Sequence, residues 1–359
     1  MSAHKMALKI FTRQTLLRLH FIVAMLFSSS SFAQISEDDY LNISISIFEA
    51  NLPSDELRQK QLNIYSEVRN AEARYIPALL RATLLESDRW GAIRIIPEAD
   101  DNAELMISGT IIHSDGLKLE VNILVIDSLG RQWINQNYSS NSDDSTSLQQ
   151  PEIGMDPFQK LYNQIQADIS HFYEQLTNAD ITHIKRIAFL RYAASLAPAS
   201  FNHYLHSSPE GLFDFTQFPA SNNPQLIRVK EIQQHEYLFI DIVDEQYQNF
   251  LISIKPVYDL WREYSRELQF NSRDYEQSQS SDFQFRRGTY RALKESYNNY
   301  RWEKMQAQYL DELSHGFSNE VLATEMALDN SVYKLAGTLE NQYKEWQEIL
   351  YAQFKLDNE

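Results

Sequence analysis

The chain has 359 residues, of which 43% are hydrophobic and 23% charged, a composition typical of a globular protein with room for two domains. It carries a formal net charge of −17 and contains no cysteine. The acidic charge disfavours nucleic acids and anionic lipid surfaces as partners, and the lack of thiols excludes disulfides, cysteine nucleophiles and thiolate metal sites.

The first 33 residues are organised like a secretory signal peptide. Four basic residues and no acidic ones precede the apolar run Phe21–Phe27, and small residues follow up to Ala33. We therefore expect cleavage between Ala33 and Gln34, which would lower the net charge to −21, and a protein located in the periplasm. An uncleaved anchor is the alternative, although the apolar run is shorter than the ~20 residues that a membrane span needs. No later segment is predicted to cross a membrane.

Residues 34–40 are predicted to be a short acidic leader, and the first folded element follows it. Apolar and polar residues alternate over 41–52, which predicts a strand. Helical spacing over 55–87 predicts two helices or one kinked helix, because Pro77 interrupts the pattern. A second strand is expected over 90–97.

The stretch from Glu104 to Tyr138 predicts three consecutive strands joined by two tight hairpin turns. Its middle strand alternates strictly between apolar and polar residues, and the turns contain Gly116 and Gly130, which tolerate positive φ. Residues 41–138 are thus expected to form a small domain with an antiparallel sheet and one helical layer. The predicted fold class is α+β.

This domain resembles a small α/β domain shared by the N-terminal domain of TolB, the curli secretion protein CsgG and the penicillin-binding-protein activator LpoB. The resemblance covers residues 41–138. It rests on the order of elements and on a strand-and-hairpin pattern whose positions here are Ala103, Glu104, Leu105, Met106, Gly109, Asp127, Gly130 and Trp133. What the resemblance implies is an envelope-associated adaptor that works by contact with other proteins, without catalytic residues.

Residues 139–157 are rich in Ser, Asp, Gln and Pro and are predicted to be an exposed linker. Beyond the linker, residues 158–359 are predicted to form a mostly α-helical bundle domain. Expected helices cover 158–176 and 180–197, open at Asn223 and at Pro256, and finish the chain over 285–313 and 319–354.

Three pairs place a carboxylate and an imidazole on one helical face: Asp168/His171, Asp180/His183 and Glu312/His315. Di-iron bundles use this spacing together with further inward glutamates, which this sequence lacks. Helix capping explains Asp180, and the dipole at a helix C-terminus explains His315. The sequence therefore predicts no metal site and no cofactor.

Asp241, Asp244 and Glu245 form the densest carboxylate cluster near aromatic residues, and paired carboxylates can hydrolyse glycans. Neighbouring acids on an acidic surface are usually solvated, so no catalytic residue is predicted. Aromatic residues are abundant in the helical half, where most are expected to form core. Those singled out as a possible interaction surface are Tyr290, Tyr297, Tyr300, Trp302, Tyr343 and Trp346.

The sequence thus predicts a non-enzymatic periplasmic adaptor or assembly factor of an envelope complex, acting through protein–protein contacts. The alternative is a protein that binds or hydrolyses cell-wall glycan with its helical domain. Envelope proteins, and peptidoglycan under the alternative, are the expected partners.

Overall fold

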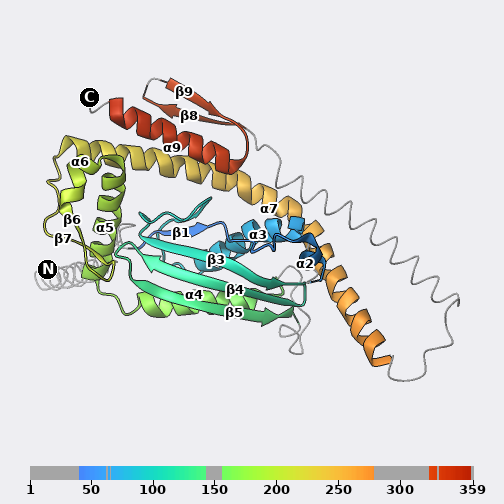
Figure 1. Cartoon of the computed structure of the whole chain (residues 1–359). Coiled ribbons are helices and arrows are strands. Elements are labelled where there is room, and N and C mark those ends of the chain that lie inside the picture. Colours follow the sequence, from blue (N-terminus) through green and yellow to red (C-terminus); the bar gives the residue numbers. More distant parts are fainter. Residues whose placement is uncertain are drawn as a thin grey trace, which may run out of the picture. The chain divides into compact units, whose positions relative to one another are not determined.

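The computed structural model describes residues 40–61, 64, 66–142, 156–278, 323–329 and 331–356, which belong to one compact unit, Tyr40–Glu359. Figure 1 shows the elements in order. The strands are β1 (Ile43–Ser46), β2 (Ile93–Ile96), β3 (Leu105–Ser114), β4 (Lys118–Asp127), β5 (Gln132–Asn141), β6 (Leu205–Ser207), β7 (Phe213–Phe215), β8 (Thr324–Leu328) and β9 (Ser331–Leu335). The helices are α2 (Glu56–Gln61), α3 (Ser66–Leu85), α4 (Gln159–Tyr173), α5 (Asn178–Leu196), α6 (Pro198–Phe201), α7 (Pro224–Ser278) and α9 (Leu339–Leu356). None of the helices in these ranges combines the length and apolarity needed to cross a bilayer.

The first five strands form one sheet in the order β2-β1-β3-β4-β5. The expected α+β class is confirmed, as is the meander β3-β4-β5, whose strands pair antiparallel. The expectation of a purely antiparallel sheet is wrong, because β1 pairs parallel with both β2 and β3. The reason is α3, which carries the chain back so that β2 runs in the same direction as β1.

Three positions of the predicted strand-and-hairpin pattern, Asp127, Gly130 and Trp133, have structural roles. The Asp127 carboxylate accepts hydrogen bonds from the backbone N–H groups of Leu129 and Arg131, each at 3.0 Å, and from Trp133 Nε1, also at 3.0 Å. It therefore fixes the turn between β4 and β5. Gly130 in that turn has φ of +87°, and a Cβ there would lie 2.9 Å from the carbonyl oxygen of Gly211. Only glycine adopts this positive φ and leaves room for the Gly211 carbonyl without strain.

α3 and α4 lie on one face of the sheet and enclose the first core (Figure 1). Leu80 and Leu84 of α3 and Ile165 and Ile169 of α4 are each at most 1% exposed and pack against the inward residues of the strands. This core also includes the start of α5. Residues from both sides of the predicted 139–157 linker therefore share one core, and the expected separation into two domains at that point does not appear.

The second core joins the other end of the sheet to the later helices. Ile96 of β2 and Met106 of β3 contribute to it, together with the end of α5, the first half of α7, the hairpin β8-β9 and α9. The described helices after residue 158 thus pack on the sheet and on one another rather than forming a separate bundle.

Two expectations for the C-terminal half need correction. The helices expected to open at Asn223 and at Pro256 are one helix, α7, whose first turn is capped by Asn223 Oδ1 accepting from the N–H of Gln225 at 2.9 Å. Pro256 costs that helix one hydrogen bond, but buried residues on both sides hold it. The described residues of the helix expected over 319–354 form the hairpin β8-β9 and then α9. The alternating burial of β8 is that of a strand. The helix expected over 285–313 lies outside the described residues.

Candidate functional site

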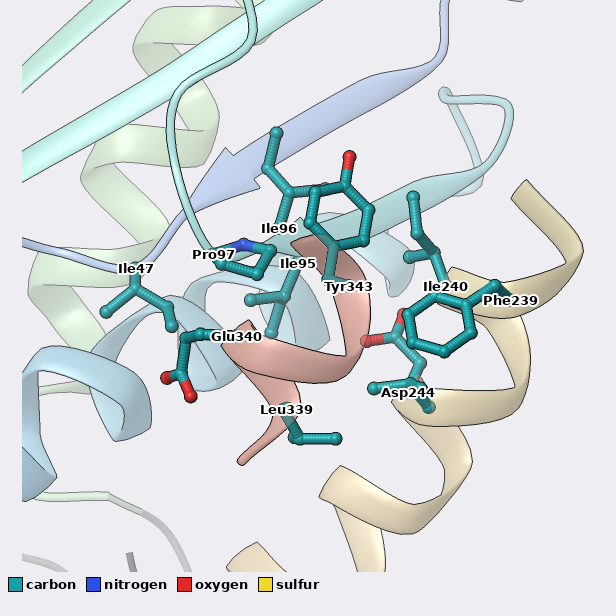
Figure 2. A pocket seen from close by; sticks show the side chains of 11 residues that line it. Ile47, Ile95, Ile96, Pro97, Phe239, Ile240, Asp244, Leu339, Glu340 and Tyr343 are labelled. Atoms are coloured by element: carbon teal, nitrogen blue, oxygen red, sulfur yellow. The ribbon is translucent and has the colours of Figure 1, made fainter. Parts of the chain in front are cut away.

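A small pocket lies where the end of β2, the middle of α7 and the start of α9 meet (Figure 2). Asp244 and Glu340 are its two acidic residues. Its volume of about 30 Å³ is enough for one or two water molecules or the narrow end of a side chain. The apolar walls are formed by Ile47, Ile95, Ile96, Pro97, Phe239, Ile240, Val243, Leu339 and the ring of Tyr343.

Local sequence explains each wall of the pocket. Pro97 follows the last residue of β2 and cannot extend the strand ladder, so the chain turns away there. Four residues of α7 at helical spacing, 239, 240, 243 and 244, face the same side. Gly337, with φ of +103°, turns the chain into α9, and Thr338 Oγ1 accepts the N–H of Asn341 at 3.3 Å as an N-cap.

Asp244 is the most buried acid of the pocket, with 6% of its surface exposed. Its Oδ2 lies 3.3 Å from Arg81 Nη2 but accepts no hydrogen bond. Burial raises the pKa of this carboxyl to about 6, an effect that the positive charge of Arg81 only partly offsets. Arg81 has a second partner, since its Nε donates to the carbonyl oxygen of Ile93 at 2.8 Å.

Two further arginine–carboxylate pairs flank the pocket. Arg94 of β2 donates to both oxygens of Asp241 on α7, at 2.8 and 3.0 Å, and its guanidinium lies 4.3 Å from the centre of the Tyr237 ring. Arg74 of α3 pairs with Glu340 of α9 at 2.6 Å. In every pair around the pocket the arginine belongs to the sheet or to α3, and the carboxylate belongs to α7 or α9. Complementary charge therefore orients the two later helices on the sheet.

Two turns before Asp244, the carboxylate of Glu236 is buried and fully engaged. It accepts hydrogen bonds from Tyr192 Oη and Tyr343 Oη, each at 2.7 Å, and from Gln347 Nε2 at 2.8 Å. Burial, and then the charge of Glu236, raise the pKa of both tyrosines well above the ordinary value. Glu236 thus ties α5, α7 and α9 together.

These contacts correct the predicted interaction surface. Trp346 is 0% exposed, its ring packs in the second core, and its Nε1 donates to the carbonyl oxygen of His235 at 3.2 Å. Tyr343 is half-buried and directs its hydroxyl to Glu236. Both residues attach α9 to α7 within the chain, where a helical stripe of aromatic residues forms a core face. The other residues of that prediction, Tyr290, Tyr297, Tyr300 and Trp302, lie outside the described residues.

A second buried polar cluster fastens the later part of α7 to α3 and to the start of α4. Arg262 pairs with Asp156 at 2.7 Å, and both side chains are about 5% exposed. The Arg262 guanidinium lies over the Tyr258 ring at 4.1 Å, and Tyr258 Oη donates to Glu72 at 2.7 Å. Each partner here is held by another residue of the same cluster, which is the arrangement of a structural anchor.

Three residues of the carboxylate–imidazole pairs have structural partners. Asp168 accepts from Tyr138 Oη at 2.8 Å, and Asp180 forms a capping box with Thr177. His183 faces Asp214 at 3.3 Å. Within the described ranges no three metal-ligating side chains converge, and Glu312 and His315 lie outside those ranges.

The carboxylate cluster of α7 is divided by the fold. Asp241 is exposed and bound by Arg94, whereas Asp244 points into the pocket beside Arg81. The side chain of Glu245 lies outside the described residues. Asp241 does not line the pocket with Asp244, so these two acids do not flank a common cleft, as a glycosidase pair must.

No family model, no curated protein and no solved structure matches this chain. The site must therefore be understood from its own chemistry.

Sequence reasoning missed Arg74, Arg81 and Glu236. A signal for the two arginines exists, because residues seven apart lie on the same face of a helix and α3 carries both. Nothing in the local sequence of Glu236 distinguishes it from a solvated acid, since its donors come from two other helices.

Proposed function

We propose that this protein is a non-enzymatic adaptor or assembly factor of an envelope complex, located in the periplasm and acting through protein–protein contacts. The observation that carries the proposal is the pocket of Figure 2. A narrow, mostly apolar pocket with one buried carboxylate suits a single side chain of another protein.

The sequence of the first 33 residues supports export, and the acidic net charge supports basic partners. The order strand, helix, strand and three-stranded meander supports the resemblance to the TolB, CsgG and LpoB domains, because that order is what the resemblance requires. The pattern residues Asp127, Gly130 and Trp133 hold the second hairpin, as expected of a scaffold.

The test is crosslinking in living cells with a tagged form of the whole chain, followed by mass spectrometry of the captured proteins. A defined envelope complex is expected in repeated experiments. The proposal fails if no such complex is captured while isolated cell-wall sacculi retain the protein, a result that would favour glycan binding.

A further inference from the structure

We propose that the pocket between β2, α7 and α9 receives a lysine side chain of a basic partner protein, whose methylene stem lies on the apolar walls and whose ammonium group binds Asp244. This proposal rests on the adaptor function and names the chemistry of its partner. Figure 2 shows the Asp244 carboxylate directed from α7 toward α9, into the space between the two helices.

The size and lining of the pocket fit a lysine better than other side chains. Lysine carries a flexible, unbranched stem that packs well on apolar surfaces, and it ends in a compact charge. The isoleucine side chains and the Phe239 ring supply such a surface, and the volume of about 30 Å³ admits a narrow group. The planar guanidinium of arginine is wider and prefers a bidentate partner.

Hydrogen bonding selects Asp244 as the acceptor. The carboxylates of Asp241 and Glu340 are already engaged by arginines, at 2.8 Å from Arg94 and 2.6 Å from Arg74. In Figure 2 the Glu340 carboxylate points away from Asp244. Asp244 is paired with Arg81, whose Nη2 lies 3.3 Å from Oδ2, but this buried oxygen accepts no hydrogen bond. A buried acceptor without a hydrogen bond is costly, and an ammonium group with three donors would satisfy it.

The chain as a whole favours the same partner. A net charge of −17 attracts basic proteins over long distances, while the pocket supplies the short-range discrimination between a lysine and a neutral side chain of the same length.

The experiment uses the purified protein and three short peptides that differ only at a central lysine, norleucine or arginine. Saturation-transfer NMR reports which peptide protons touch the protein, and a titration gives each dissociation constant. We expect transfer to the lysine methylenes and binding at least tenfold tighter than that of the norleucine peptide. Asp244→Asn should weaken lysine binding at least tenfold, and Val243→Phe should block it by filling the pocket. Glu345→Gln, the same charge change at an exposed position of α9, should leave it within twofold.

Three results would overturn the pocket proposal: equal binding of the norleucine peptide, tighter binding of the arginine peptide, or lysine binding that survives Asp244→Asn. The cellular crosslinking separates this failure from that of the adaptor function. If Asp244→Asn captures the same complex as the unchanged protein, the adaptor function stands and the pocket proposal falls. If lysine binding depends on Asp244 but the unchanged protein captures no envelope complex, the adaptor function falls.

Discussion

Glu236 and Asp244 are two buried carboxylates only eight residues apart on α7, yet their surroundings differ. Glu236 has three donors, all neutral, from α5 and α9. Asp244 is paired with Arg81, and one of its oxygens accepts no hydrogen bond. Burial raises the pKa of Asp244 to about 6. A buried acid can thus be stabilised by hydrogen bonds from neutral donors alone. A nearby opposite charge does not ensure that each carboxylate oxygen accepts a hydrogen bond.

Glu236 and Asp244 therefore have different roles. The Glu236 region is closed, because every donor that reaches the carboxylate belongs to this chain. Asp244 lines a pocket, and its buried oxygen without a hydrogen bond is expected to lower the stability of the folded protein. Substitutions at the two positions should therefore change stability in opposite directions.

The largest effect is expected for Glu236→Ala. Removing the acceptor leaves the hydroxyls of Tyr192 and Tyr343 without their partner in or near the core, so we expect a loss of about 3 kcal/mol in the free energy of unfolding. Urea denaturation followed by circular dichroism measures it. Glu348→Ala, at an exposed position of α9, is the control and should change stability by under about 0.5 kcal/mol. A loss below about 1 kcal/mol at Glu236 would show that the three hydrogen bonds do not hold α9.

Asp244→Asn is expected to stabilise the protein at neutral pH. In the folded protein the pKa of this carboxyl is about 6, above its ordinary value of 3.8, so the folded state holds the proton more tightly than the unfolded chain. The free energy of unfolding therefore falls as pH rises from about 4 to 6 and is constant above that range with respect to this group. The deficit at pH 7 is about 3 kcal/mol at most, and the asparagine variant should recover part of it.

The measurement is urea denaturation at several pH values between 4 and 8. The gain from Asp244→Asn should be present at pH 7 and vanish near pH 4. Burial also raises the pKa of Asp100 to about 6. Asp100→Asn should therefore remove a further part of the fall in the free energy of unfolding between pH 4 and pH 6. A gain from Asp244→Asn that is the same at pH 4 and pH 7 would mean that ionisation of Asp244 is not its cause.

Local signals in the sequence predict structure well, whereas contacts between distant segments are not predicted. The strands between Glu104 and Tyr138 are recognisable because alternation and turn glycines are local signals, and β3, β4 and β5 follow them closely. Trp346 belongs to the possible interaction surface because amphipathic aromatics are common at interfaces, and the local sequence does not say which face of the last helix is covered. The Asp241 and Asp244 cluster was visible, but whether each acid meets an arginine depends on α3 and β2, far away in the sequence.

Tyr343→Phe should give a smaller loss, of about 1 kcal/mol, because it removes one hydrogen bond to Glu236 and leaves the other two. The aromatic ring, which packs near Phe239, is kept. Tyr351→Phe on the same helix is the matched control, since that side chain is 39% exposed and should tolerate the change within about 0.3 kcal/mol. Equal losses of stability at the two tyrosines would mean that the hydrogen bond to Glu236 contributes nothing beyond ordinary packing.

The smallest effect is expected for the exposed pair between Arg94 and Asp241 beside the pocket. Both oxygens of Asp241 accept from the guanidinium, but its side chain is 52% exposed, so water and salt screen the attraction. A double-mutant cycle with Arg94→Gln and Asp241→Asn should give a coupling energy of about 0.5 kcal/mol that shrinks further in 1 M salt. A coupling above about 2 kcal/mol, or one that salt does not change, would mean that this pair contributes as a buried pair does. An exposed pair would then contribute to the stability of α7 on the sheet as much as a buried acid does.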